Sequence, residues 1–189
     1  GIIPDSFTFS SAISACEKGG QWEQALDLLV EMRRCGVPPD VITFNSAISA
    51  CAKCGQWERA LDILGEMRQF RLQPDVISFS AAITACEKGA QWKRALDLLD
   101  EMRRCRIEYS VITFNAAISA CEKGKQWHRA IGLLDEMRHY NLEPNVISFS
   151  SAISACEKGG QWERALDLLD EMRSRRVEPN VISFNAAIS

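Results

Sequence analysis

Short hydrogen-bonding side chains recur at two places in this sequence, and both places repeat every 35 residues. At the first place serine and asparagine alternate, in the order Ser10, Asn45, Ser80, Asn115, Ser150 and Asn185. At the second place stand Asp40, Asp75, Ser110, Asn145 and Asn180. An aspartate carboxylate only accepts hydrogen bonds, whereas an asparagine amide also donates them. These positions therefore suit the recognition of a ligand by its donors and acceptors.

The sequence shows no pattern typical of a catalytic site or a metal site. His128 and His139 are the only histidines and fall in one repeat, so no repeated pairing of a nucleophile with a base is visible. Cys51 and Cys54 form the only C-x-x-C and lack the remaining ligands of a zinc site. We expect no catalysis, metal or cofactor.

The interval of 35 residues organises the whole chain. Trp22, Trp57, Trp92, Trp127 and Trp162 follow it, as do Met32, Met67, Met102, Met137 and Met172. A fixed period of this length indicates a tandem array in place of a single globular core. The pattern restarts to give repeats 6–40, 41–75, 76–110, 111–145 and 146–180, with partial repeats 1–5 and 181–189.

Each repeat predicts two helices. In 41–75, apolar residues at Phe44, Ala47, Ile48 and Cys51 and again at Trp57, Ala60, Leu61, Leu64 and Met67 have helical spacing. We expect helices over roughly 41–53 and 57–69. Glycines such as Gly55, Gly89, Gly124 and Gly159 fall where the first helix ends and suggest left-handed caps. Proline ends the second helix, and the aspartate, serine or asparagine that follows is a good N-cap.

A lone hairpin cannot bury both of its apolar faces, so neighbouring hairpins must stack. We predict an all-α, right-handed α-solenoid of helix-turn-helix hairpins, with the Trp, Phe and Met residues in its core. The other side of each first helix would line a concave groove, exposing in one repeat Ile42, Asn45, Ser49, Ala52 and Lys53.

Bulk properties add limits. The net charge of −3 and the pI near 5.5 give no general attraction to polyanions. No stretch approaches 18 apolar residues, so we expect no membrane span. Five of the eight cysteines keep the 35-residue period as small buried side chains, which favours a reducing compartment over a disulfide framework.

The repeat resembles the pentatricopeptide repeat (PPR) over essentially the whole chain. It begins Val-Ile-Ser/Thr-Phe-Ser/Asn, continues through Cys-x-Lys and Glu-Met, and ends Pro-Asp/Asn. Trp stands where that family usually has an aliphatic residue, and Tyr109-Ser110 replaces Pro-Asp/Asn. Acidic residues also flank the lysines, at Glu17, Glu87, Glu122 and Glu157.

The resemblance implies sequence-specific binding of single-stranded RNA, one base per repeat. The implied base-reading pairs are Ser10/Asp40, Asn45/Asp75, Ser80/Ser110, Asn115/Asn145 and Ser150/Asn180. The implied base-sandwiching residues are Phe7, Ile42, Ile77, Ile112, Ile147 and Ile182. The implied phosphate-facing residues are Lys18, Lys53, Lys88, Lys123 and Lys158. An organellar location and a role in RNA processing, stability, editing or translation follow from the same resemblance, with other RNA-processing proteins as further partners and no small-molecule substrate.

The chemistry of each pair suggests a base. Aspartate suits the imino N–H of G and U, and asparagine suits the ring-nitrogen acceptors of A and C. In the family, serine at the fifth place accompanies purines and asparagine accompanies pyrimidines. The predicted target is 5′-G-U-A-C/U-A-3′, in which the fourth base leans to C and Ser80/Ser110 is not a strong pair.

Other interpretations stay open. The last residue of each repeat could be only a helix cap, and the serine/asparagine alternation could be drift on a solvated face. The lysines could complement the negative end of a helix. The array could also bind proteins or act as a scaffold, as the similar tetratricopeptide arrays do.

Overall fold

The structure is a computed structural model that describes residues 5–188. Residues 1–4 and 189, which belong to the two predicted partial repeats, lie outside the described residues. The chain forms two compact parts, Gly1–Gly89 and Ala90–Ser189, and each is described by itself. Over the described residues the secondary structure is entirely helical, which confirms the predicted all-α class of helical hairpins.

Each of the first ten helices has 13 residues. In the first part they are α1 (Ser6–Lys18), α2 (Trp22–Arg34), α3 (Val41–Lys53), α4 (Trp57–Gln69) and α5 (Val76–Lys88). In the second part they are α6 (Trp92–Arg104), α7 (Val111–Lys123), α8 (Trp127–His139), α9 (Val146–Lys158), α10 (Trp162–Ser174) and the shorter α11 (Val181–Ile188). The helices predicted at 41–53 and 57–69 are therefore confirmed.

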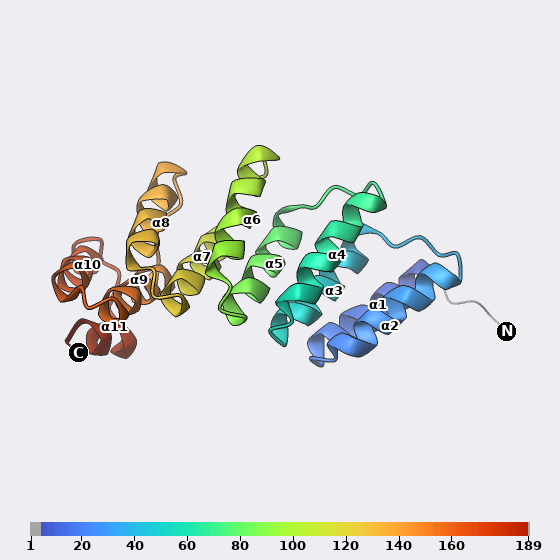
Figure 1. Ribbon diagram of the computed structural model, residues 1–189, viewed down its shortest axis with the longest axis horizontal. Helices are drawn as coiled ribbons and strands as arrows, with labels where there is room; N and C mark the ends of the chain where they lie inside the picture. Colours follow the sequence, from blue (N-terminus) through green and yellow to red (C-terminus); the bar gives the residue numbers. More distant parts are fainter. Residues whose placement is uncertain (1–4, 189) are drawn as a thin grey trace. The chain divides into compact units, whose positions relative to one another are not determined.

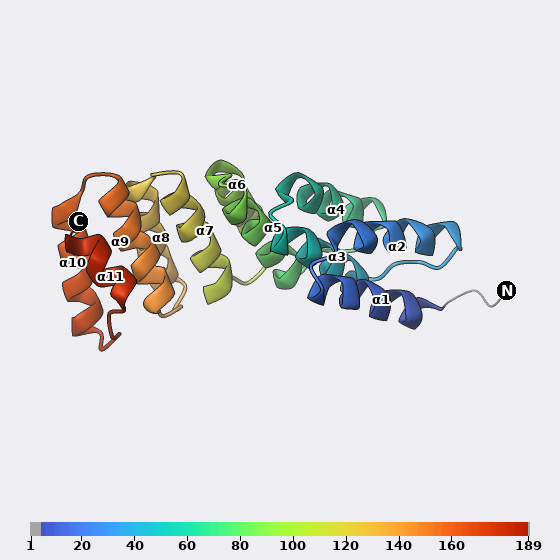
Figure 2. The same ribbon diagram turned by 90° about the horizontal axis from the view of Figure 1, so that it is seen from below.

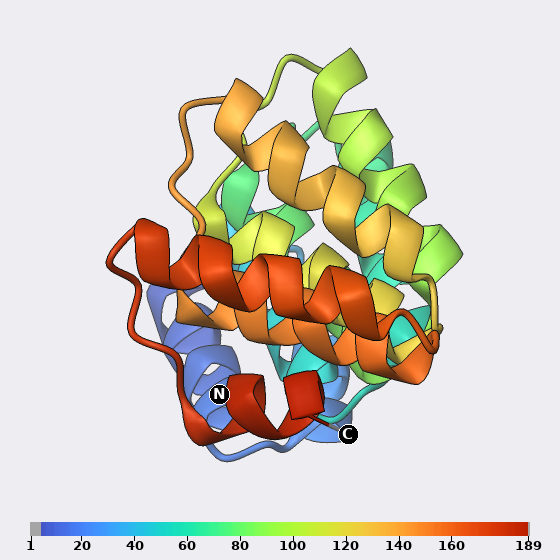
Figure 3. The same cartoon turned by 90° about the vertical axis from the view of Figure 1, so that its left-hand side faces the viewer.

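The hairpins stack in the same way within each part. In the first part, α3 packs between α1 and α5 and against its own partner α4, while α2 packs on α3 and α4 on α5 (Figures 1 and 2). In the second part, α9 packs between α7 and α11 and contacts α8 and α10. Figure 3 shows the orange α9 beside the red-orange α10. First helices thus form a row, and each second helix rests on the first helix of the next repeat.

The core lies between these helices. Phe44, Ile48 and Cys51 of α3 are fully buried, as are the equivalent residues of α5, α7 and α9. Burial raises the pKa of the thiol to about 11 in Cys51 and about 12 in Cys121. These cysteines are therefore small, unreactive core side chains, as predicted, whereas Cys16 at the start of the first part is only half-buried.

The predicted N-caps are confirmed. Asp40 accepts a hydrogen bond from Thr43 N, Ser110 from Thr113 N, and Asn145 from the N–H groups of Ile147 and Ser148. Asp75 and Asn145 also belong to capping boxes, in which the serine three residues later bonds back to the N-cap backbone.

The predicted role of the glycines after the first helices is wrong for Gly89, Gly124 and Gly159. Their φ angles are −79°, −80° and −92°, which are not left-handed. The left-handed residue is the next one, and it is not always glycine: Ala90 and Lys125 have φ angles of 54° and 56°.

These three glycines instead make room for tryptophan rings. A Cβ at Gly89 would lie 2.3 Å from Trp57 Cδ1, one at Gly124 2.2 Å from Trp92 Cδ1, and one at Gly159 2.4 Å from Trp127 Cδ1. Each ring therefore lies directly on the backbone where the first helix of the next repeat ends. The glycine is required by this contact between repeats.

The prediction of tryptophan in the core is wrong for the same reason. Trp57, Trp92 and Trp127 are half-buried, and Trp162 is 63% exposed. Each begins a second helix beside the turn of its hairpin, and Trp57, Trp92 and Trp127 cover the equivalent turn of the next repeat. The phenylalanine and methionine stripes do form the core, where Phe44 and Met67 are fully buried.

Tyr109 stands where the other repeats have proline, and it makes aromatic contacts that proline cannot make. Its hydroxyl donates to the carbonyl of Leu99, and its ring centroid lies 5.1 Å from that of Phe114 and 4.7 Å from that of Tyr140. Ser110 still caps α7, so the helix begins normally after this departure.

None of the helices between residues 5 and 188 has the length and apolar character needed to cross a bilayer.

Gly124→Ala should lower the free energy of unfolding by about 1–3 kcal/mol, because the new methyl group overlaps the Trp92 ring. Gly19→Ala is the matched control, since the same place in the first repeat has nothing closer to a Cβ than Ala15 O at 3.5 Å. We expect it to change stability by less than about 1 kcal/mol. Urea unfolding followed by circular dichroism measures both, and equal losses would contradict the tryptophan contact.

Candidate functional site

In each compact part, exposed apolar side chains stand at the starts of the first helices. Ile42 is 70% exposed and Ile77 57%, and Phe7, Ile112, Ile147 and Ile182 are similarly open. These are the predicted base-sandwiching residues. Large apolar side chains exposed at the same place in every repeat suggest a surface that meets a ligand.

The first repeat shows how the predicted site residues gather. A hollow of about 710 Å³ is lined by Phe7, Ser10 and Lys18 of α1, with Asp40 and Ile42 at the start of α3. The structure thus brings one predicted base-reading pair, two predicted sandwiching residues and one predicted phosphate-facing lysine to one surface.

The predicted base-reading pair Asn45/Asp75 is joined by direct hydrogen bonds. Asn45 Nδ2 lies 3.1 Å from Asp75 Oδ1 and 3.3 Å from Oδ2. Ser78, the third residue of the next repeat, donates to Asn45 Oδ1 at 2.5 Å. We call such a group a seam cluster: the fifth and last residues of one repeat with the third residue of the next.

Asn115, Asn145 and Ser148 form the same arrangement in the second part. Asn115 Nδ2 donates to Asn145 Oδ1 at 3.2 Å, and Ser148 Oγ donates to Asn115 Oδ1 at 2.5 Å. The asparagine-containing seam clusters are therefore alike in both parts of the chain.

Serine at the fifth place changes the geometry. Ser10 Oγ lies 2.8 Å from Thr43 Oγ1, which in turn lies 2.6 Å from Asp40 Oδ1. The threonine hydroxyl therefore relays the contact between this predicted pair.

The last seam cluster combines direct and relayed contacts. Ser150 Oγ lies 2.9 Å from Ser183 Oγ and 3.2 Å from Asn180 Oδ1. Ser80 and Ser110 belong to different compact parts, so each is described alone: Ser80 lies in α5, and Ser110 caps α7.

The expectation that Asn45 and Ala52 line an open groove is wrong. Asn45 is 8% exposed and Ala52 4%. Asn115 and Ser150 are also buried, because these positions face the neighbouring first helix. The last residues of the repeats, including Asp40 and Asn145, are more open.

Hydrogen bonds stabilise the charged form of Asp75. Burial on its own would raise the pKa of this carboxyl, but bonds from Ser78 N, the Ser78 hydroxyl, Asn45 and the Ile77 N–H outweigh it and hold the pKa below the ordinary value of 3.8. Asp75 therefore acts in the seam cluster as an ionised acceptor at neutral pH.

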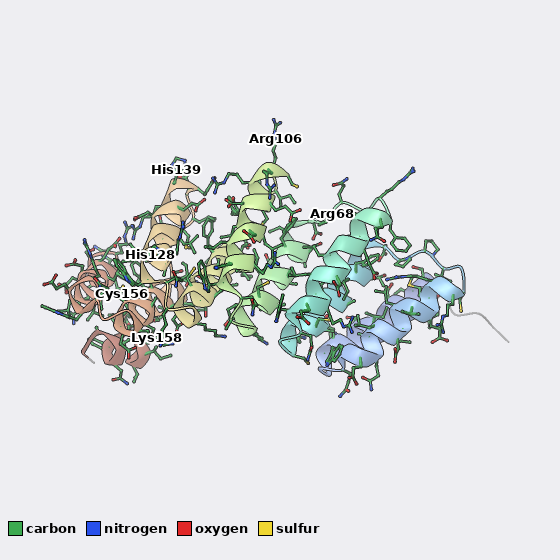
Figure 4. The ribbon with its side chains drawn as sticks, in the orientation of Figure 1. Arg68, Arg106, His128, His139, Cys156 and Lys158 are labelled. Carbon is green, nitrogen blue, oxygen red and sulfur yellow. The ribbon has the colours of Figure 1, made fainter. Side chains whose placement is uncertain are left out.

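The predicted phosphate-facing lysines are exposed, but several already have partners. Lys53 Nζ lies 3.0 Å from Glu17 Oε1, Lys158 Nζ lies 2.8 Å from Glu122 Oε1, and Lys88 Nζ donates to the carbonyl of Lys53 at 2.9 Å. Figure 4 labels Lys158 at the end of α9. These lysines complement the end of the preceding first helix, which agrees with the structural interpretation of their role.

The third residues of the repeats were missed by sequence reasoning. Thr43, Ser78, Ser148 and Ser183 are fully buried, and each bonds to both predicted base-reading residues of the preceding repeat or relays between them. A hydroxyl recurs at this place in every repeat, which was the available signal.

The second helices also join successive repeats. Glu66 pairs with Arg33 of the preceding second helix, and Arg138 pairs in the same way with Glu171. Asp62 instead pairs with Arg59 of its own helix α4, and both of these side chains are exposed.

The described residues offer no alternative catalytic constellation. His128 and His139 stand at opposite ends of α8 (Figure 4). Between residues 5 and 188, no group of three or more His, Cys, Asp or Glu residues is placed to hold a metal ion.

Stacked helical hairpins of 35 residues, with seam clusters recurring within each part, define a helical-repeat protein. Family profiles described as PPR repeat family match residues 4–53 and 39–88, those described as pentatricopeptide repeat domain match 97–161 and 133–189, and PPR repeat matches 77–107. The chain belongs to the pentatricopeptide repeat family.

Solved structures agree. The chain is 26% identical to the maize pentatricopeptide repeat protein PPR10, with a TM-score of 0.80 over 98% of this chain and 27% of that one. A complex of PPR10 with an 18-nt psaJ RNA element matches with a TM-score of 0.77, 26% identity, and coverage of 100% of this chain and 26% of the other. The chain thus spans about a quarter of the length of that relative.

The PPR domain of Arabidopsis thaliana protein-only RNase P 1, solved in complex with tRNA, has a TM-score of 0.82 at 16% identity over 95% of both chains. The nuclear proteinaceous RNase P 2 of A. thaliana has a TM-score of 0.77 at 12% identity, over 89% of this chain and 38% of that one. These two likenesses concern the fold. The comparison with curated protein sequences found no match.

Asp75→Asn should make stability less dependent on pH in the acid range, because asparagine still caps α5 but does not titrate. The lowered pKa of Asp75 stabilises the folded protein above the ordinary carboxyl pKa of 3.8, and this contribution is lost as pH falls through the folded value. The difference in unfolding free energy between the two proteins should therefore shrink from pH 6 to pH 3. Urea titrations across this range measure it, and a constant difference would contradict the assignment.

Proposed function

We propose that this chain binds single-stranded RNA in a sequence-specific way, one base per repeat. The observation that carries the proposal is the seam cluster, in which the fifth and last residues of a repeat meet beside an exposed isoleucine. The PPR10 and RNase P 1 complexes with RNA give the family precedent.

The cap residues support the assignment of bases. Asp40 and Asp75 only accept hydrogen bonds, so they suit the imino N–H of G at the first position and of U at the second. Asn145 Oδ1 accepts from Ile147 N, Ser148 N and Asn115 Nδ2. Among the described residues no acceptor takes the Asn145 amino group, which therefore suits the ring-nitrogen acceptor of C.

Asn180 resembles Asn145 in using its side-chain oxygen within the protein. Its Oδ1 accepts from Ser183 N and Ser183 Oγ, so its amino group suits the ring nitrogen of A. Ser110 has a single oxygen, which already caps α7 and contacts the Thr113 hydroxyl at 2.6 Å. The proposed target is 5′-G-U-A-C-A-3′, with the third base the least specified.

The remaining roles follow from exposure and charge. Phe7 and the isoleucines would contact the faces of the bases. Five lysines each neutralising one phosphate would give a log–log salt slope of about −3.5 on single strands. Because Lys53 and Lys158 already pair with glutamates, we expect a shallower slope.

We further propose that the chain acts by binding and not by catalysis, since its only two histidines lie at opposite ends of α8. An organellar location stays a prediction from the family. One structural relative is a nuclear protein, so the fold does not decide the compartment.

Selection of the 189-residue chain against a randomised single-stranded RNA pool, sequenced at low and moderate salt, tests the proposal. We expect enrichment of G-U-A-C-A in this register. A flat profile without salt-sensitive binding would overturn it and favour a protein-binding or scaffold array.

Asn45→Ser combined with Asp75→Asn should move the preference at the second base from U towards A by about ten-fold. With Ser78, the double variant has the same three residues as the cluster of Ser150, Asn180 and Ser183. Fluorescence anisotropy with four RNAs that differ only at this base measures the shift. Equal weakening of all four RNAs would show that these residues do not read the base.

Glu122→Gln should strengthen binding of every RNA about two- to five-fold at low salt and steepen the salt slope, because it releases Lys158 for phosphate. Lys158→Ala should do the opposite and flatten the slope by about 0.7. Asp167→Asn is the charge-matched control, since Asp167 pairs with Arg164 on α10, away from the first helices. An equal gain from Asp167→Asn would point to net charge alone.

A further inference from the structure

The third residue of a repeat lies buried behind the proposed base-reading pair of the preceding repeat. The side chains of Thr43, Ser78, Ser148 and Ser183 are completely buried. Each hydroxyl nevertheless lies within 3.3 Å of polar side-chain atoms of both the fifth and the last residue of the preceding repeat. Its influence on RNA must therefore pass through those residues.

At Thr43 the direction of every hydrogen bond is fixed by chemistry. The Asp40 carboxylate only accepts, so Thr43 must donate its single hydroxyl proton to Asp40 Oδ1. The contact between Ser10 and Thr43 at 2.8 Å then requires Ser10 to donate. Ser10 is left with lone pairs, and so offers a base only an acceptor.

At Ser78 the outcome is different. Asn45 Oδ1 and Asp75 Oδ1 both only accept, so they share the single proton of Ser78, with the shorter contact of 2.5 Å to Asn45 and the longer one of 2.9 Å to Asp75. This fixes the amide, with Oδ1 towards Ser78 and Nδ2 towards Asp75. Asn45 keeps one N–H and one lone pair for a base, and Ser148 holds Asn115 in the same orientation.

At Ser183 the proton of Ser150 is also kept within the cluster. Asn180 Oδ1 only accepts, from Ser183 Oγ at 2.8 Å and from Ser150 Oγ at 3.2 Å. The Ser183 proton goes either to Asn180 or to Ser150. In the first case the Ser150 proton goes to Ser183 or to Asn180, and in the second case it goes to Asn180. Ser150 therefore offers a base only lone pairs, like Ser10.

The sequence varies in step with this geometry. The residue 33 positions after each fifth residue is serine when the fifth residue is Asn45 or Asn115, and threonine when it is Ser10. A longer side chain is thus matched with a shorter one inside a buried cluster. Ser150, followed by Ser183, is the exception among these four clusters.

We infer that the third residue of each repeat is a positioning residue for the base read by the preceding repeat, because its hydroxyl fixes the orientation and the donor or acceptor character of that repeat's fifth residue. The inference rests on the proposed function. At the first base, Ser10 and Asp40 then present two acceptors, which match the adjacent N1–H and N2–H₂ donors of G. At the second base, Asn45 adds a donor for a carbonyl of U beside the acceptor Asp75.

Thr43→Val and Thr43→Ser form the principal test in the 189-residue chain. Valine keeps the shape of threonine without the hydroxyl, whereas serine keeps the hydroxyl. Anisotropy with RNAs varied at the first or the second base gives the preference at each. Thr43→Val should reduce the preference for G at the first base about two- to ten-fold and leave the second base unchanged, and Thr43→Ser should retain both.

Ser78→Ala and Ser148→Ala keep the test decisive if the valine variant does not fold. Ser78→Ala should reduce the preference at the second base, and Ser148→Ala should reduce it at the fourth base. Each variant is therefore the other's control for general damage to the fold. If the wild-type chain has no base preference, the proposed function fails and this inference with it. If the wild type discriminates but these variants weaken all RNAs alike, or relax the base of their own repeat, only the positioning role is overturned.

Discussion

Each first helix is stabilised at its start by the residue before it, whose side chain accepts hydrogen bonds from the N–H groups of the first turn. In this protein that residue also ends the preceding repeat, and its side chain meets the fifth residue of that repeat. One side chain therefore starts a helix, links two repeats and lies at the rim of the first-helix row. The interpretation of these residues as caps and their interpretation as base readers are compatible, because both use the same side chain.

The cap requirement also limits the recognition chemistry that is available. Asp75 and Asn145 both cap with Oδ1, so they differ only in their second terminal atom, an accepting Oδ2 or a donating Nδ2. A helix start thus tolerates either residue, while a ligand would distinguish them. Ser110 has no second terminal atom, so on the proposed function the third repeat would specify its base least.

The sequence was sufficient where the deciding interactions lie within one helix. Spacing of apolar residues gave the bounds of α3 and α4, and the buried positions Phe44, Ile48 and Cys51 followed from the same pattern. It was insufficient for contacts between repeats. The periodicity of one helix does not show that the Trp57 ring lies on Gly89, so tryptophan was assigned to the core.

In the candidate site too, the sequence predicted which residues take part but not the contacts between repeats. The exposed isoleucines and the pairing of Asn45 with Asp75 agree with the residues chosen from the sequence. The burial of Asn45 and the hydroxyl of Ser78 were missed, because both depend on how closely one first helix approaches the next. The alternation of serine and asparagine at the fifth place is matched by the third residue of the next repeat in three of the four clusters described, and the periodicity of one helix does not show this.

On the surface of the first helices, positive charge is partly neutralised whereas hydrogen-bonding groups are held in fixed orientations. Glu17 and Glu122 neutralise Lys53 and Lys158, and the chain carries a net charge of −3, so attraction to phosphate is weak and local. Phosphate contacts contribute affinity without information on sequence. A surface that limits them and places hydrogen bonds in buried, oriented clusters makes discrimination between bases a larger share of its binding energy. On the proposed function, the acidic neighbours of the lysines therefore favour selectivity over general attraction to phosphate.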